Sequence, residues 1–265
     1  MTAPVLAVRG ARLEFGPRTL WRDLDLDVGA GEFVAVLGPN GTGKTSLLRA
    51  ILGQQQLTAG TVEVPAGRAC VGYIPQQRLL PEGTPLRARD LVALGVDGAR
   101  WGLPLPRAAT RRRVDELLAT VGASGYANAP VARLSGGEQQ RLRVGQAIAN
   151  DPVLLLCDEP LLSLDIANQR MVSALIDAER RRTGAAVLFV THDVNPVLDV
   201  VDRVLYLAGG TFRIGTPDEV LRSEVLSALY GTPVDVFRAH GRIVVVGAPE
   251  QGEHHEHTEA TELAL

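Results

Sequence analysis

Apolar residues along the 265-residue chain occur in short runs of two kinds. Residues 5–15 and 24–28 alternate between apolar and polar side chains, which is typical of strands that bury one face. Residues 33–37, 153–157 and 186–190 are instead continuous apolar runs, as expected for central strands of a parallel sheet covered on both faces. The chain is therefore predicted to contain a buried central sheet and a smaller N-terminal sheet with an exposed face.

Helix-forming stretches lie between these runs. The predicted helices span 46–52, 107–121, 136–150, 166–182 and 217–230, and further predicted strands span 71–74, 204–207 and 211–214. Strands that alternate with helices predict an α/β fold with a mostly parallel central sheet, beside which the N-terminal strands form a small antiparallel β subdomain. We expect one domain over residues 1–248, with a helical subdomain inserted at about 78–150, and a disordered acidic tail at 249–265 that contains histidines.

Composition narrows the class of protein without defining its function. No apolar run approaches the roughly 18–20 residues of a membrane span, and residues 1–10 lack the basic and then apolar layout of a secretory signal. We therefore expect a cytoplasmic protein that a partner can hold at a membrane. Net charge is −3, and residues 250–265 carry five glutamates with no lysine or arginine. The rest of the chain, at about +2, is not basic enough to indicate nucleic-acid binding.

The basic residues give the first indication of a functional site. Of the 27 lysines and arginines, 26 are arginine, and the only lysine is Lys44. Lys44 lies in a Gly-x-x-x-x-Gly-Lys-Thr loop between a buried strand and a helix, the context of a P-loop. The glycines let backbone N–H groups surround phosphate oxygens, and the helix N-terminus adds the positive end of its dipole. A compact ammonium fits between two phosphates, whereas a guanidinium is larger and geometrically fixed. The expected phosphate-binding residues are Gly38, Pro39, Asn40, Gly41, Thr42, Gly43, Lys44, Thr45 and Ser46.

Two adjacent carboxylates follow the second central strand, at Asp158 and Glu159. Ligands bind at the carboxyl ends of strands in open α/β sheets, so both side chains are expected near the P-loop. Asp158, together with the Thr45 hydroxyl, is predicted to hold Mg²⁺. Glu159 is then placed to orient and polarise an attacking water. The sequence therefore predicts hydrolysis of ATP, with Glu159 and Lys44 as catalytic residues.

Residues 134–141, Leu-Ser-Gly-Gly-Glu-Gln-Gln-Arg, resemble the signature of ATP-binding cassette (ABC) ATPases. The stretch lies between the P-loop and the Asp158–Glu159 strand, as it does in that family. Ser135 and the glycines form a second anion-binding helix start. In the family this helix start caps the ATP held by the opposing subunit, which implies a second copy of the chain. The resemblance makes Ser135, Gly136, Gly137 and Glu138 nucleotide-contacting residues.

Other elements of the same family follow in order. Gln76 resembles the Q-loop glutamine that senses magnesium and the transport partner, and Gln77 is the less favoured choice for that role. Asp165 resembles the D-loop aspartate. His192, after the third central strand, resembles the switch histidine that contacts the γ-phosphate, which makes it a third catalytic residue.

Two departures from the family pattern occur. Phe15 stands where the family usually has a tyrosine that stacks on adenine, and loss of the hydroxyl leaves stacking intact. Leu161 and Leu162 stand ahead of Asp165, where small polar residues are common. The detailed contacts of the D-loop are therefore in question, but hydrolysis is not.

The resemblance covers about residues 5–230 and favours an importer subunit. The chain has one cassette, no coiled-coil insertion and no fused membrane span. Residues 72–77, 84–92, 191–197 and 229–236 resemble the ATPases of zinc and manganese importers. The implied function is ATP hydrolysis that drives uptake of one of these metals through a separate permease. The alternative is a soluble ABC-type ATPase with an assembly or regulatory role.

An importer subunit implies a set of partners and a location. ATP and Mg²⁺ are the expected ligands, a membrane permease and a second copy are the direct partners, and a substrate-binding protein acts through the permease. Such a subunit is peripheral, at the cytoplasmic face of the membrane. The tail adds three of the five histidines, at 254, 255 and 257. These indicate either a weak metal-binding tail or incidental histidines in a disordered segment.

Overall fold

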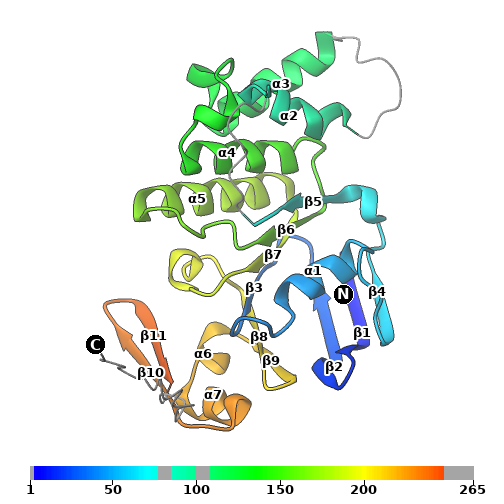
Figure 1. Cartoon of the computed structure of the whole chain (residues 1–265), viewed down its shortest axis with the longest axis vertical. Helices are drawn as coiled ribbons and strands as arrows, with labels where there is room; N and C mark the ends of the chain where they lie inside the picture. The colour runs from blue at the N-terminus through cyan, green and yellow to red at the C-terminus, as the bar shows by residue number, and fades with distance from the viewer. Residues whose placement is uncertain (1–2, 77–84, 99–107, 248–265) are drawn as a thin grey trace, which may run out of the picture.

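The computed structural model describes residues 3–76, 85–98 and 108–247 (Figure 1). Its centre is a six-stranded sheet in the order β5-β6-β7-β3-β8-β9, parallel except for the antiparallel edge strand β9. The strands span Phe33–Leu37 (β3), Val71–Ile74 (β5), Leu154–Asp158 (β6), Ala186–Val190 (β7), Arg203–Ala208 (β8) and Thr211–Gly215 (β9). The predicted α/β class with a mostly parallel sheet is confirmed.

A small antiparallel sheet lies beside the central one, in the order β2-β1-β4. It consists of β1 (Leu6–Phe15), β2 (Arg18–Val28) and β4 (Ala59–Glu63). Strand β2 begins six residues before the predicted 24–28, because a positive φ of 52° at Asp23 interrupts the alternating pattern that marks the later half. Strand β4 was not predicted, since its residues are mostly exposed and show no apolar periodicity.

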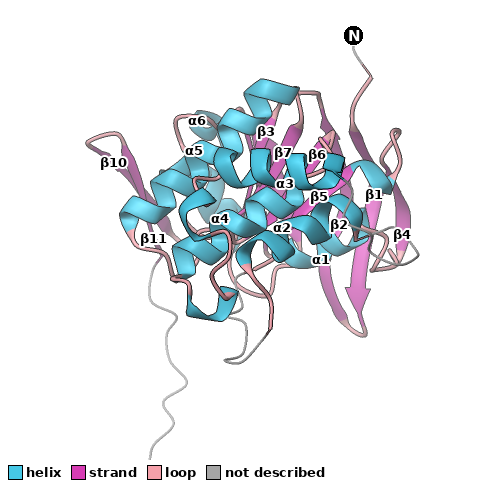
Figure 2. Ribbon diagram, turned by 90° about the horizontal axis from the view of Figure 1, so that it is seen from above, coloured by secondary structure: helices cyan, strands magenta, loops and turns pink. Residues whose placement is uncertain are grey.

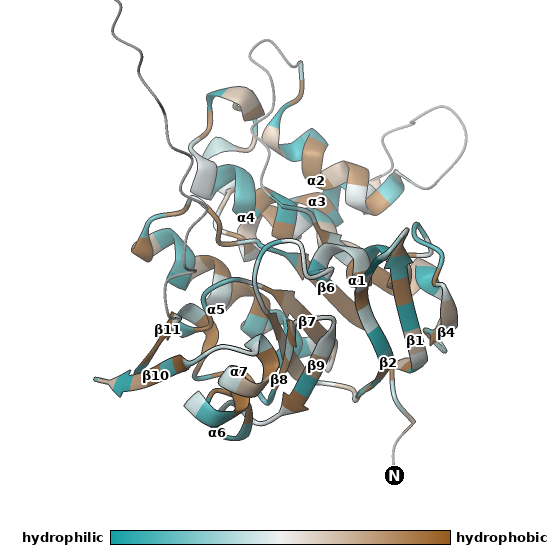
Figure 3. Ribbon diagram, turned by 60° about the horizontal axis from the view of Figure 1, so that its bottom comes forward, coloured by the Kyte–Doolittle hydropathy of each residue, from teal (hydrophilic) through white to brown (hydrophobic). Residues whose placement is uncertain are grey.

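Two apolar cores cover the two faces of the central sheet. On one face α1 (Lys44–Ile51) and the N-terminal sheet bury alternate strand residues such as Val34 and Leu188. On the other face α5 (Ile166–Thr183) and the remaining helices bury the intervening residues, such as Ala35 and Phe189. Strands β3 and β7 are therefore apolar along their whole length, whereas β1 and β2 alternate in hydropathy (Figure 3).

Helices form a separate layer at one end of the molecule (Figures 1 and 2). They are α2 (Ala88–Asp97), α3 (Ala108–Thr120) and α4 (Gly136–Ala147), which share a core that includes Val92, Leu117 and Leu142. Helix α2 was not predicted, because the surrounding prolines and glycines obscured its pattern. The boundaries predicted for the domain and its helical subdomain stay predictions, and the tail at 249–265 lies outside the described residues.

The C-terminal part differs most from the predicted elements. The single helix predicted for 217–230 is wrong, because Leu221 leaves the helical conformation and divides it into α6 (Pro217–Val220) and α7 (Ser223–Tyr230). A two-stranded sheet of β10 (Val234–Ala239) and β11 (Arg242–Gly247) follows, which the sequence did not predict. No helix in the described part of the chain is long and apolar enough to cross a membrane.

Candidate active site

The loop between β3 and α1 has a conformation that its glycines alone permit. Gly38 has a φ of 138°, and a Cβ at this position would lie 2.1 Å from the carbonyl oxygen of Leu207. Gly43 has a φ of 92°, and its Cβ would lie 2.7 Å from Nε1 of Trp21. A side chain at Gly38 would therefore clash with backbone, and one at Gly43 would clash with the buried side chains of Trp21 and Leu20. The sequence therefore folds locally into a concave loop whose backbone approaches a ligand closely, as the P-loop motif predicts.

The lysine of this loop is buried, with 6% of its surface exposed. Its Nζ donates hydrogen bonds to the carbonyl oxygens of Gly38 at 2.7 Å and Pro39 at 2.9 Å. Burial lowers the pKa of the Lys44 ammonium, while the nearby carboxylates of Glu159 and Asp158 act in the opposite direction. An anionic ligand in the loop would compensate the loss of water around this ammonium.

The first carboxylate lies beneath the P-loop. Asp158, 2% exposed at the end of β6, accepts a hydrogen bond from the Thr45 hydroxyl at 3.0 Å and one from the Tyr73 hydroxyl at 3.3 Å. Burial raises the pKa of the Asp158 carboxyl, although the hydrogen bonds from Thr45 and Tyr73 act in the opposite direction. The predicted proximity of Thr45 and Asp158 is therefore observed.

The side chains of Thr45 and Asp158 fit Mg²⁺ better than a metal that needs a closed protein cage. Over residues 3–76, 85–98 and 108–247 no group of three His, Cys, Asp or Glu side chains could hold a metal ion. Mg²⁺ is bound by one or two carboxylates together with water and substrate phosphates. A hydroxyl beside a buried carboxylate, next to a phosphate-binding loop, meets that requirement.

Replacing Asp158 with Asn is expected to raise the melting temperature of the nucleotide-free protein by about 2–4 °C at neutral pH, the shift that roughly 1 kcal/mol produces in a chain of this size. Folding raises the pKa of the Asp158 carboxyl. The contribution of this carboxyl to wild-type stability is therefore present below its unfolded pKa of about 4 and is lost as pH rises through its folded pKa. Asparagine has no charge to bury. Calorimetry without Mg²⁺ should therefore find a difference in melting temperature between Asp158→Asn and wild type that widens above pH 4. A difference independent of pH would contradict this explanation.

The second carboxylate faces the predicted switch histidine. Strands β6 and β7 pair in parallel with Asp158 opposite Val190, so the residues after both strands are neighbours. Glu159 adopts a φ of 47°, rare for a residue other than glycine, and its N–H donates to the Val190 carbonyl at 3.0 Å. Its Oε2 lies 3.1 Å from His192 Nδ1. The backbone strain fits a functional position, since it directs the Glu159 side chain to His192.

The signature segment and the predicted D-loop lie side by side. Ser135 caps α4 in a reciprocal pair with Glu138, and its side-chain hydrogen bonds in the described part stay within this first turn. A Cβ on Gly137 would meet the side chain of Asn168 at 2.3 Å. Asn168 in turn donates two hydrogen bonds to Asp165, the N-cap of α5. The predicted nucleotide contacts of Ser135, Gly136, Gly137, Glu138 and Asp165 stay predictions.

The remaining predicted residues are exposed or lie in the core. Gln76 is exposed two residues after β5, and Phe15, 49% exposed, ends β1. Their roles as ligand contacts stay predictions, and Gln77 lies outside the described residues. Leu161 is 5% exposed and belongs to the apolar core, which explains an aliphatic residue ahead of the D-loop.

Two contacts of the site were missed by sequence reasoning. Tyr73 pairs with Leu156 on the neighbouring strand, and its hydroxyl reaches Asp158, two residues further along β6. Arg18, at the start of β2, donates to the Gly41 carbonyl in the P-loop at 2.8 Å. Both contacts join segments distant in sequence, so no local pattern could have indicated them.

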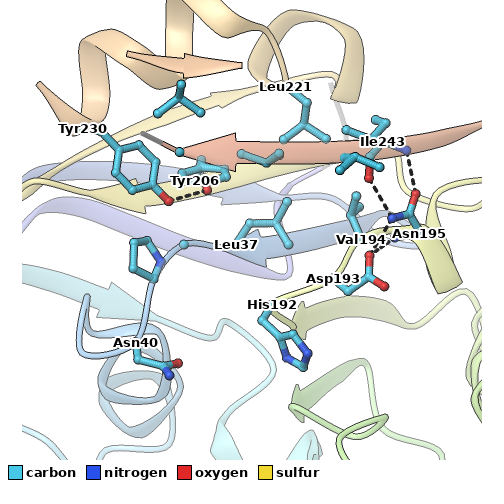
Figure 4. Close-up of a pocket in the computed structure, with 16 residues that line it drawn as sticks. Leu37, Asn40, His192, Asp193, Val194, Asn195, Tyr206, Leu221, Tyr230 and Ile243 are labelled. Carbon is cyan, nitrogen blue, oxygen red and sulfur yellow. Dashed lines mark hydrogen bonds between the residues drawn. The ribbon is translucent and has the colours of Figure 1, made fainter. Parts of the chain in front are cut away.

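A cavity of about 570 Å³ adjoins the site on the side of β11 (Figure 4). The P-loop residues Pro39 and Asn40 form one wall, and His192 and Asn195 form another. The opposite wall comes from α7 and β11, through Tyr230 and Ile243 among others. The C-terminal hairpin therefore shares a cavity with the P-loop and the segment that carries His192.

Comparison with known proteins gives consistent matches. A family model described as ABC transporter matches residues 21–162. The zinc import ATP-binding protein ZnuC of Roseobacter denitrificans is 37% identical over 225 residues, which are 85% of this chain and 84% of that protein. The aliphatic sulfonates import ATP-binding protein SsuB 2 of Frankia alni is 41% identical over 205 residues, 77% of this chain and 78% of that protein.

A solved structure shares the fold over almost the whole chain. It is described as a metal-chelate type ABC transporter in an inward-facing conformation, and it superposes with a TM-score of 0.80 at 26% identity. The match covers 93% of this chain and 98% of that one.

Proposed function

Because this chain belongs to the ABC transporter family and is an ATPase, we propose that it energises import of zinc or manganese through a separate membrane permease. One observation carries the chemical part of the proposal. Lys44, Asp158, Glu159 and His192 come from three segments that meet at one edge of the central sheet, with Glu159 in contact with His192. This arrangement combines a phosphate cradle with a carboxylate positioned for water activation.

The residues have distinct roles in the proposed reaction. The P-loop amides and Lys44 bind the β- and γ-phosphates of ATP, and Thr45 with Asp158 holds Mg²⁺. When bound, Mg²⁺ neutralises part of the charge on the phosphates. Glu159 orients and polarises the attacking water, and His192, in contact with Glu159, binds the γ-phosphate.

We propose that a second copy completes each site. Ser135 is the N-cap of α4, which begins at Gly136 and Gly137, and a helix N-terminus of this kind can bind an anion. In a face-to-face pair they would cap the nucleotide on the opposing P-loop, and Asp165 beside them would meet the same interface. ATP binding then closes the pair and hydrolysis reopens it.

The permease is expected to contact the helical layer at the exposed Gln76 and at the residues that follow it. Part of this segment, up to Trp101, lies outside the described residues. A substrate-binding protein would act only through the permease. The chain is then peripheral, at the cytoplasmic face of the membrane.

The names of the relatives favour a metal ion over other substrates. Several relatives named as zinc import ATP-binding proteins match 85–97% of the chain at 34–37% identity. The sulfonate relative has the higher identity, 41%, but covers 77%. A relative named as an sn-glycerol-3-phosphate import ATP-binding protein also covers 87% of the chain, but at 32% identity. The zinc relatives combine such coverage with higher identity, which favours the metal, and manganese is retained because the same sequence segments resemble both metal groups.

The test is uptake into vesicles that contain the chain and the permease with which it co-purifies. Zinc or manganese uptake that requires ATP, and that stops when Glu159 is replaced by Gln, is the expected result. Uptake of sulfonates alone would support the role as an importer subunit and refute the proposal that the substrate is a metal. A chain that hydrolyses ATP but never co-purifies with a multi-span membrane protein would favour the soluble assembly or regulatory ATPase.

A further inference from the structure

The C-terminal hairpin is held to the domain at two separate places. On one side, the Ser227 hydroxyl of α7 accepts a hydrogen bond from the N–H of Val234 at 2.9 Å and donates one to its carbonyl at 3.2 Å. The Ser223 hydroxyl accepts another from the N–H of Val236. These contacts attach β10 to α7.

On the other side, one side chain holds β11. The Asn195 Oδ1 accepts a hydrogen bond from the N–H of Ile243 at 2.8 Å, and its Nδ2 donates to the Ile243 carbonyl at 2.9 Å. The amide thus satisfies both backbone groups of one residue, as a neighbouring strand would. Ile243 is itself 5% exposed, so both bonds lie where water competes little.

The same amide also reaches the residue next to the switch histidine. Nδ2 of Asn195 donates to Asp193 Oδ1 at 2.7 Å, and the backbone N–H of Asn195 donates to the same oxygen at 2.9 Å. Asp193 is joined in turn to Thr191, whose hydroxyl donates to the Asp193 carbonyl at 2.8 Å. His192 therefore stands between two residues that are each fixed by hydrogen bonds.

The His192 side chain, by contrast, is largely exposed. It is 58% exposed, and its Nδ1 lies 3.1 Å from Glu159 Oε2. The conformation of its backbone, rather than packing around the ring, must therefore direct it. Figure 4 shows the Asn195 bonds to Asp193 and Ile243 along one side of the cavity that His192 also lines.

We propose that Asn195 is a positioning residue for His192, and that the C-terminal hairpin acts on ATP hydrolysis through it. The inference rests on the proposed function, because it gives the hairpin a part in the same reaction. Asn195 does not touch the reacting atoms. It couples the position of β11 to the Asp193 side chain, so that a displacement of the hairpin turns the histidine away from Glu159.

Replacing Asn195 with Ala is expected to lower kcat by roughly tenfold, a fraction of the 10²–10³-fold that loss of one preorganised charge-stabilising donor costs. The KM for ATP should change less than about twofold, since the P-loop is untouched. The matched control is Ser227→Ala, which removes hydrogen bonds of the hairpin at β10 but leaves β11 held by Asn195. Its kcat should stay within about twofold of wild type.

A second readout needs no ATP. The chain has five histidines, so the imidazole resonances can be followed by NMR, with His192→Gln used to assign the signal of His192. Asn195→Ala should shift the His192 resonances in the nucleotide-free protein, and Ser227→Ala should not. Asn195→Asp, which keeps the acceptor for the N–H of Ile243 but sets a carboxylate against Asp193, should shift them as well if the alanine variant does not fold.

Two outcomes would overturn the inference. Equal losses of kcat in Asn195→Ala and Ser227→Ala would make the hairpin a structural element only. Unchanged His192 resonances in both Asn195 variants would show that the Asn195 side chain does not position His192. If the wild-type protein does not hydrolyse ATP, the proposed function fails, while the resonances still decide the link between Asn195 and His192.

Discussion

Glu159→Gln is expected to lower the rate of ATP hydrolysis by at least about 100-fold while ATP still binds. The amide keeps the size of the carboxylate and an oxygen that can face His192 Nδ1, now 3.1 Å from Oε2. It lacks the negative charge that polarises the attacking water. The binding loop is unchanged, so ATP affinity should stay within a few-fold of wild type. Phosphate release and equilibrium binding of ATP measure the two quantities separately.

The control for this variant is Glu116→Gln, which removes a carboxylate that is 65% exposed on α3. That variant should hydrolyse ATP at the wild-type rate. If Glu159→Gln retained more than about a tenth of wild-type turnover, the catalytic base would have to be another residue. The rare backbone conformation of Glu159 would then lack its functional explanation.

The second large effect is expected from Lys44→Arg, a change that keeps the charge. Lys44 Nζ lies within hydrogen-bond distance of two carbonyl oxygens of its own loop and is 6% exposed. A planar guanidinium is too large for this space and cannot point one compact charge between two phosphates. Loss of one or two charge-assisted bonds, each worth about 1.5–3 kcal/mol, predicts that ATP affinity falls by at least about tenfold.

The chain supplies its own control, because arginine fills every other basic position. Arg111→Lys on the exposed side of α3 makes the reverse exchange outside the site and should leave ATP affinity unchanged. Near-normal affinity in Lys44→Arg would mean that the loop tolerates either cation. The single lysine would then be an accident of composition.

The core of the site could be predicted from the sequence because its residues follow central strands. Lys44 follows β3 through its glycine loop, Asp158 ends β6, and His192 comes two residues after β7. Parallel strands deliver their carboxyl ends to one edge of the sheet, so the order of apolar runs and polar ends was sufficient. The neighbouring register of β6 and β7 explains why Glu159 and His192 also meet.

The supporting contacts could not be predicted in this way. Tyr73 and Asn195 reach their partners across neighbouring strands or across 48 residues of chain, where local patterns carry no information. The C-terminal hairpin was missed because its β11 strand exposes three consecutive valines and lacks alternation between buried and exposed positions. The break between α6 and α7 was missed because Leu221 is apolar and continues the helical pattern that it interrupts.

The central claim is that each ATP site is built from two chains, and the association state of Glu159→Gln tests it most directly. With hydrolysis blocked, sedimentation velocity with ATP and Mg²⁺ should find pairs of chains, and with ADP it should find single chains. Adding Ser135→Arg to this variant should keep the chains single in ATP, because the cap on the opposing nucleotide is lost. Single chains of Glu159→Gln at saturating ATP would contradict the account.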